Sequence, residues 1–233
     1  MSDLRSRPSS GVLLWDIDGT LIRTKRPNSS SPHKNVLRRR GHAFDETKLE
    51  LSGFTDYEVF LELVNNGGSE LIETHLRDIF HDLDDESKYL DKGSTFDLFP
   101  GVQSILEVLS LRGWAHGILT GNTSARMAAK LKLTGITDHF NEEFLFSCKF
   151  GDSRENITRN ARESLNRKHH HRVLIIGDTP KDIVSARLSN FPVISVATGS
   201  FSVTDLSNFG PNLLLKNLED DADILLKFLG TPS

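Results

Sequence analysis

Short apolar runs that alternate with segments of helical period constrain the fold of this 233-residue chain more than any other feature. From residue 101 onward, these runs are separated by segments in which apolar residues return every three or four positions. This alternation is typical of βαβ units, so we predict an α/β fold with a doubly wound, mostly parallel sheet. The predicted strands are residues 12–15, 115–119, 144–146, 173–176 and 193–197, with 213–215 as a candidate sixth.

The region between residues 25 and 94 carries helix signals and no convincing strand pattern. Ser31 followed by Pro32 is typical of a helix start. Asp56 precedes a second helical face that stops at Gly67 and Gly68, and Ser69 begins a third. Because these helices interrupt the pattern after its first strand, we predict an all-helical insertion, or cap, over the carboxyl end of the sheet. The predicted domains are a core of residues 1–24 and 95–233 and a cap of residues 25–94.

The two connections between core and cap are residues 23–28 and 92–99, which are polar or rich in Gly, Pro and Ser. Such segments are typical of hinges. Both connections leave the core on the same side, so we predict a cap that moves over the edge of the sheet.

Composition and charge exclude several classes of partner. The formal charge of −4 and the isoelectric point near 6.1 provide no basic surface for nucleic acid or anionic lipid. No apolar run is long enough for a secretory signal or a membrane span, so we predict a soluble protein without a membrane partner. Cys148 is the only cysteine, which excludes an intramolecular disulfide and makes a cytoplasmic location the default. The sequence does not specify an oligomeric state.

Polar side chains follow three of the predicted strands at the point where each strand ends. Asp16 and Asp18 follow the first strand and lead into a glycine turn, Thr120 ends the second, and Asp178 follows the fourth. Because the carboxyl ends of parallel strands meet at one edge of a sheet, we expect these four side chains to converge there.

Each of these residue types fits a step of metal-assisted phosphoryl transfer. Mg²⁺ takes oxygen ligands, so Asp16 and Asp178 could hold it by their carboxylates while Asp18 offers its backbone carbonyl. Asp16 could also attack phosphorus and form an aspartyl phosphate, and Asp18 could give a proton to the leaving group and later take one from water. Thr120 and the N–H groups after it could hydrogen-bond the phosphoryl oxygens. The predicted substrate-binding residues at this strand end are Gly121 and Asn122.

The same transition state requires a cation, and the sequence offers two candidates. Lys149 directly follows a predicted strand, which favours it as a point charge near the sheet edge. Arg154 opens a helix, and its planar fork suits the bidentate oxygens of a phosphoryl group. The spacing alone does not choose between them.

Three segments together resemble the haloacid dehalogenase-like hydrolase superfamily. Residues 16–21 (DIDGTL), 119–122 (LTGN) and 177–182 (GDTPKD) match its first, second and fourth motifs. Flanking features, among them 99–102 (FPGV) and 150–152 (FGD), resemble the phosphoglycolate phosphatase-like group with a helical cap. The resemblance implies a Rossmann-like core, Mg²⁺ as cofactor and a phosphate ester as substrate.

The resemblance also implies roles for residues outside these motifs. In that group an arginine followed by an aliphatic residue and an alanine tends to supply the third motif, which favours Arg154 over Lys149. The segment 53–56 (GFTD) resembles the substrate-facing turn of the cap, so Thr55 and Asp56 are expected to contact substrate, although either could simply start a helix. For Asp182 we favour a supporting role, in which it orients Lys181 or the metal site, over that of an acid at a helix start.

We therefore predict a Mg²⁺-dependent phosphatase that hydrolyses a small phosphomonoester, such as phosphoglycolate or a sugar phosphate, through an aspartyl phosphate on Asp16. Two alternatives stay open: a phosphomutase on the same core, and a catalytically idle protein that keeps the fold for binding or regulation. A carbon–halogen hydrolase is disfavoured, because a halide leaving group needs neither the proton of Asp18 nor a metal held by Asp178.

Overall fold

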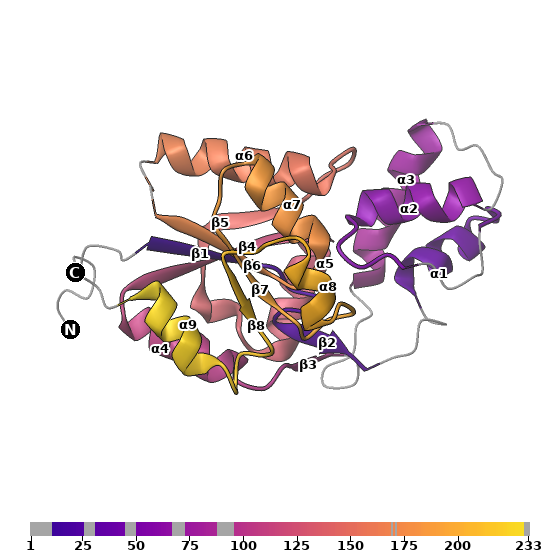
Figure 1. Ribbon diagram of the computed structural model, residues 1–233. Helices are drawn as coiled ribbons and strands as arrows, with labels where there is room; N and C mark the ends of the chain where they lie inside the picture. Colours follow the sequence, from indigo (N-terminus) through magenta and orange to yellow (C-terminus); the bar gives the residue numbers. More distant parts are fainter. Residues whose placement is uncertain are drawn as a thin grey trace.

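A six-stranded parallel sheet forms the centre of the larger part of the molecule (Figure 1). The computed structural model describes residues 11–25, 31–44, 50–66, 73–87, 96–168, 170 and 172–230. The strand order is β5-β4-β1-β6-β7-β8, so the chain leaves β1 toward one side of the sheet and later returns to the other. The strands are β1 (Gly11–Trp15), β4 (Trp114–Thr123), β5 (Phe140–Cys148), β6 (Val173–Gly177), β7 (Val193–Val196) and β8 (Leu213–Leu215).

Helices cover both faces of this sheet, which explains why its strands read as continuous apolar runs. Along β1, Val12 and Leu14 belong to one hydrophobic cluster, while Leu13 and Trp15 belong to the other, as the alternation of a strand requires. One face is covered by α6 (Arg154–Arg167) and α7 (Pro180–Leu188), and the other by α4 (Val102–Leu111), α5 (Ser124–Thr134) and α9 (Ala222–Leu229). A short helix α8 (Val203–Ser207) and a 3₁₀ turn (Thr137–His139) complete the core. The predicted α/β class and its six strands are confirmed.

Two further strands were not expected from the sequence. β2 (Ile22–Thr24) and β3 (Phe96–Leu98) form an antiparallel ribbon, with Arg23 opposite Asp97. The ribbon lies where we predicted two polar hinges, and Lys25 adds an ion pair with Asp97 at 2.8 Å. The described parts of the two connections are therefore paired with each other, and the rest of the predicted hinges, residues 26–28 and 92–95, lies outside the described residues.

Three helices lie between β2 and β3 in the sequence and form a separate group beside the carboxyl end of the sheet (Figure 1). They are α1 (Pro32–Arg39), α2 (Asp56–Asn66) and α3 (Glu73–Glu86), so the described part of the predicted insertion is helical, while its bounds stay a prediction. Their apolar faces pack on one another through residues such as Leu37, Phe60 and Leu83. The predicted boundary at residues 94–95 lies outside the described residues.

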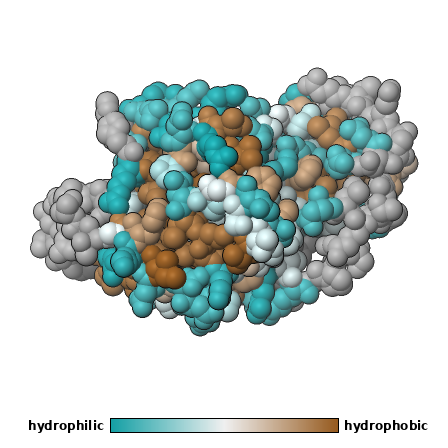
Figure 2. All heavy atoms as spheres, in the orientation of Figure 1, coloured by the Kyte–Doolittle hydropathy of each residue, from teal (hydrophilic) through white to brown (hydrophobic). Residues whose placement is uncertain are grey.

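The helix α9 divides its apolar side chains between the core and the surface. Leu225 and Leu229 are buried, whereas Ile224 and Phe228 are exposed. Figure 2 shows apolar residues gathered on this face over α9 and the edge strand β8. Within the described ranges, no helix combines the length and the apolar character that crossing a membrane requires.

Candidate active site

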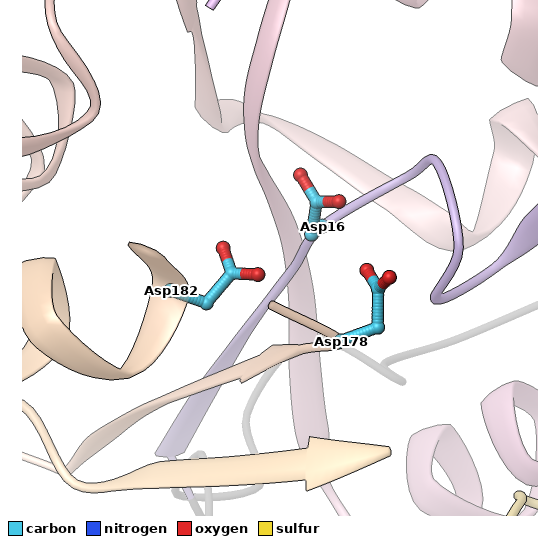
Figure 3. A group of neighbouring side chains, drawn as sticks. All are labelled: Asp16, Asp178 and Asp182. Carbon is cyan, nitrogen blue, oxygen red and sulfur yellow. The ribbon is translucent and has the colours of Figure 1, made fainter. Parts of the chain in front are cut away.

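The ends of β1 and β6 bring three carboxyl groups together. Asp16 follows β1, Asp178 follows β6, and Asp182 lies in the first turn of α7. Figure 3 shows their carboxyl groups projecting to the same side of the strand ends, and one oxygen of each lies within 4.8 Å of those of the other two. The convergence expected from a parallel sheet is thus present for Asp16 and Asp178.

The backbone around Asp178 leaves room for its carboxylate and nothing larger. A Cβ added to Gly19, whose φ is +86°, would lie 2.1 Å from Asp178 Oδ2, and one added to Gly199 would lie 1.8 Å from it. The hydroxyl of Thr20 donates a hydrogen bond of 3.0 Å to Asp178 Oδ1. Gly19 of the first motif therefore does more than turn the chain, because it lets the loop approach the carboxylate of Asp178 closely.

Charge repulsion and burial make this acidic group costly by itself. Burial, together with the charges of Asp182 and Asp18, raises the pKa of Asp16 to about 7 against the opposing effect of Arg154. Burial and the charges of Asp16 and Asp182 raise the pKa of Asp178 well above its ordinary value. A divalent cation would relieve both effects. The site thus fits a metal, and its donors are the hard oxygens that Mg²⁺ prefers.

Both carboxylate oxygens of Asp182 accept hydrogen bonds from protein groups. One of its oxygens accepts a hydrogen bond from Arg154, and the other accepts from the N–H (3.0 Å) and the hydroxyl (2.7 Å) of Thr179 in a capping box that starts α7. Asp16 and Asp178 are therefore the carboxylates of this group with oxygens left for a metal. Lys181, which Asp182 was expected to orient, instead contacts Glu58 of α2 at 3.3 Å.

The structure separates the two candidate cations. Arg154 is 1% exposed, and its Nη1 donates a hydrogen bond of 3.1 Å to Asp16 Oδ1. Asp182 and Asp16 raise the pKa of Arg154 despite its burial, so it carries its charge at any working pH. Lys149 is exposed, and its described hydrogen bonds are made by its backbone, with Asp152 and Cys148. The geometry places Arg154, and not Lys149, beside the predicted nucleophile.

A second cluster surrounds Asp18 and contains a residue that the sequence analysis missed. Lys130 of α5 lies 2.5 Å from Asp18 Oδ2 and 2.7 Å from Asn122 Oδ1. Asn122 Nδ2 donates both to Asp18 Oδ2 (2.7 Å) and to the hydroxyl of Thr120 (2.8 Å). Burial raises the pKa of Asp18, but the charge and hydrogen bond of Lys130 outweigh it and the pKa is lowered. Thr120, Asn122 and Asp18 therefore form one hydrogen-bonded unit.

The turn before α2 brings the cap close to the core. A Cβ on Gly121 would lie 2.7 Å from the carbonyl oxygen of Phe54 and 2.9 Å from the Cα of Thr55, so only glycine permits this approach. The Thr55 hydroxyl donates to the carbonyl of Asp152 at 2.8 Å and accepts from the N–H of Glu58 at 3.1 Å. The predicted substrate contact of Thr55 stays a prediction, and these bonds argue against it.

Asp56 is likewise engaged by protein groups. Its Oδ1 lies 2.9 Å from His33 Nε2, and its Oδ2 accepts from the N–H of Thr123 at 2.8 Å and lies 3.0 Å from Arg126 Nε. Against the effect of burial, Arg126 and His33 hold the pKa of Asp56 well below its usual range. Sequence reasoning missed Arg126 and His33. The available signal was the spacing of Arg126 and Lys130, which puts both cations on one face of a helix.

Core and cap together line a cavity of about 640 Å³ that is open to solvent. Its wall includes the predicted catalytic and metal-binding residues Asp16, Asp18, Thr120, Arg154 and Asp178. The cap and the ribbon also contribute to the wall, with residues that include His33, Lys34, Gly53, Phe54, Asp56, Arg23 and Phe96. The cavity is large enough for a small phosphate ester. Its wall carries both the carboxylates and the cation that phosphoryl transfer requires.

Known proteins resemble the chain over most of its length. A phosphoglycolate phosphatase from Nitrosococcus oceani is 25% identical over 231 residues, covering 92% of this chain and 96% of the relative. A pyrophosphatase from Oceanobacillus iheyensis is 23% identical over 210 residues, covering 90% and 94%. A solved structure described as a predicted phosphatase from Clostridium acetobutylicum superposes with a TM-score of 0.69 at 21% identity, over 94% of this chain and all of that one.

These matches confirm the predicted class of enzyme, a hydrolase that acts on phosphoric monoesters, because the relatives include phosphatases. The model of one family, the haloacid dehalogenase-like hydrolases, matches residues 13–196 and so includes all three strand ends that build the site. The chain belongs to the haloacid dehalogenase-like hydrolases.

Proposed function

We propose that this protein is a Mg²⁺-dependent phosphatase that hydrolyses a small phosphomonoester through an aspartyl phosphate on Asp16. The observation that carries the proposal is the position of Asp16. Its carboxyl group lies close to that of Asp178 and accepts a hydrogen bond from Arg154, in a cavity wall that also contains Asp18. A nucleophile, a second metal-binding acid and a fixed cation thus meet at one point.

In the first step, an oxygen of Asp16 attacks phosphorus and the bond between phosphorus and the leaving oxygen breaks. Asp18 gives its proton to that oxygen, and the product alcohol departs. Arg154, Thr120 and the N–H groups after Thr120 stabilise the charge on the phosphoryl oxygens. The negative phosphate, entering beside Asp18, raises the pKa of this carboxyl against the effect of Lys130 and favours its protonated form.

In the second step, water attacks the phosphorus of the aspartyl phosphate and the bond to Asp16 breaks. Asp18, now ionised and held by Lys130 at 2.5 Å, accepts the proton of the water. Inorganic phosphate leaves and Asp16 is restored. Mg²⁺, held by the carboxylates of Asp16 and Asp178 and the carbonyl of Asp18, would neutralise the phosphate charge and keep Asp16 ionised.

The cap supplies the environment of the leaving group. His33, Phe54 and Asp56 lie in the cavity wall, and the cap turn sits directly on Gly121 of the core. We assign the choice of substrate to the insertion between β2 and β3, and we propose that it excludes water from the site in the arrangement described above. The relatives named for phosphoglycolate and pyrophosphate indicate small anionic substrates.

Release of inorganic phosphate from a panel of metabolite phosphates, with and without Mg²⁺, tests the proposal. Asp16→Asn should abolish turnover, and chelation of the metal should do the same. Asp138→Asn, at an exposed position, is the matched control and should leave activity unchanged. Undiminished phosphate release by Asp16→Asn would overturn the proposal. Phosphate transfer to a second sugar phosphate, without release, would indicate a mutase, and no turnover of any ester would indicate an idle protein.

A further inference from the structure

We propose that Arg126 forms a second anion-binding subsite in the cavity. The enzyme would then select phosphate compounds whose leaving group carries another negative charge close to the bridging oxygen. This inference rests on the proposed phosphatase function and narrows its substrate class, because a neutral sugar leaving group would leave the subsite unused.

The guanidinium of Arg126 has donors that no described protein group uses. Arg126 is 7% exposed and lies in the cavity wall. Its Nε lies 3.0 Å from Asp56 Oδ2 as an ion pair but is buried without a hydrogen-bond partner, and its terminal nitrogens donate no hydrogen bond to the part of the chain that the structure describes. A buried guanidinium with unused donors is costly unless an acceptor enters the cavity. A ligand anion would supply that acceptor.

The cap holds Arg126 in a fixed orientation. Asp56, at the start of α2, takes the Nε side of the guanidinium and is itself bound by His33 of α1 and the N–H of Thr123. Both oxygens of Asp56 are therefore used, so this acid cannot also turn toward the terminal nitrogens. The terminal pair stays available as a fork, a geometry that matches the two oxygens of a carboxylate or a phosphate.

The other buried cations of the cavity wall already have partners. Arg154 bonds to Asp16 and Asp182, and Lys130 bonds to Asp18 and Asn122. Arg154 has an unpartnered Nε, but both of its terminal nitrogens are used, whereas no side-chain hydrogen bond of Arg126 is present among the described residues. The first anionic group of the substrate belongs beside Arg154, and a second belongs beside Arg126.

The spacing along α5 indicates how far apart the two groups lie. Arg126 precedes Lys130 by four residues, so the two side chains are neighbours about 5–6 Å apart on one face of the helix. Lys130 contacts Asp18, which handles the leaving oxygen. A second anion at Arg126 therefore lies about one helical turn from the scissile bond, within reach of a leaving group two or three atoms long.

The test compares substrates that differ in the charge of the leaving group. Phosphoglycolate presents a carboxylate, pyrophosphate presents a phosphate, and glycerol 2-phosphate presents neutral hydroxyls. For Arg126→Met we expect kcat/KM to fall about 10- to 100-fold with the first two, mainly through KM, and less than about threefold with glycerol 2-phosphate. The relative loss with phosphoglycolate and pyrophosphate identifies which anion the subsite prefers. Lys132→Met, on the exposed face of the same helix, is the control and should leave kcat/KM unchanged with all three substrates.

Two further variants separate recognition from damage to the fold. Arg126→Met leaves Asp56 without its ion pair, so the double variant Asp56→Asn/Arg126→Met removes both charges and should show the same substrate dependence. Equal losses with all three substrates, or no loss with the anionic ones, would overturn the subsite. A wild-type protein that releases phosphate from none of these compounds and from no ester of the metabolite panel would instead overturn the proposed phosphatase function.

Binding measured without turnover keeps the two proposals distinct. In the Asp16→Asn background, calorimetry with phosphoglycolate should show about 10- to 100-fold weaker binding when Arg126→Met is added. Equal affinity in the two variants would refute the subsite, whatever the wild-type protein hydrolyses.

Discussion

Replacing Asp16 by Asn should make the metal-free protein more stable at pH 8 while it abolishes catalysis. In the unfolded chain, Asp16 has its ordinary pKa near 3.8, and in the fold its pKa rises to about 7, because the carboxyl group is buried near Asp182 and Asp18 and Arg154 compensates only in part. The neutral amide keeps the shape of the side chain and removes the charge that the fold disfavours.

The magnitude follows from the shift. An acid with a raised pKa in the fold contributes stability that is present below pH 3.8 and is lost as the pH rises toward 7. The shift is about three pKa units, each equivalent to about 1.4 kcal/mol, so ionised Asp16 costs about 4 kcal/mol at pH 8. For a chain of this length, we expect Asp16→Asn to raise the melting temperature by about 10 °C. At pH 5 less than half of this gain should remain.

Thermal unfolding in EDTA at pH 5 and pH 8 measures the effect, with Asp138→Asn as the matched control. Added Mg²⁺ should stabilise the wild-type protein at pH 8 and Asp16→Asn much less, since the variant has lost a ligand. Equal or lower stability of Asp16→Asn at pH 8 in EDTA, or a difference that does not depend on pH, would refute the reasoning. It would mean that Arg154 fully neutralises the acidic group.

Three other perturbations have direct readouts. Lys130→Met removes the ion pair of Asp18 and should lower kcat at least about tenfold, and an unchanged kcat would argue against a role for Asp18 in proton transfer. His116 accepts a hydrogen bond from the indole of Trp15, and burial lowers the pKa of its ring to about 4. Because the folded state favours the neutral ring, the free energy of unfolding should fall by about 2 kcal/mol between pH 6.5 and pH 5. Urea unfolding of His116→Gln at both pH values should lack this loss, and an identical pH dependence would contradict it. Gly121→Ala places a methyl group against Phe54 and should push the cap away, raising KM more than it lowers kcat, and unaltered kinetics would show that the approach is not needed.

The sequence predicts the sheet well and the ribbon poorly, for a physical reason. Strands such as β1 and β6 are buried on both faces, so every position is apolar and the run is conspicuous. β2 has only three residues, of which Arg23 and Thr24 are exposed, and its pairing with β3 depends on a segment more than seventy residues away. No local periodicity could indicate it.

The same distinction applies to the site. Asp16, Thr120 and Asp178 stand at strand ends, a position that the topology of a parallel sheet makes meaningful in the sequence itself. Lys130 and Arg126 lie inside a helix, where a cation four residues from another is ordinarily a solvated surface pair. Arg126 is buried against Asp56 of the cap and Lys130 against Asp18 and Asn122 of the core, and these tertiary contacts leave no trace in the local sequence.

Asp182 belongs both to the start of a helix and to the charge balance of the site, since one oxygen caps α7 and the other holds Arg154. The cation beside Asp16 is therefore oriented only in molecules in which the first turn of α7 has formed and docked. A partly unfolded population would contribute nothing to turnover, because it lacks the arginine in its place. Specific activity should consequently report the native fraction of any destabilised core variant, and it should decline together with the hydrogen-exchange protection of α7.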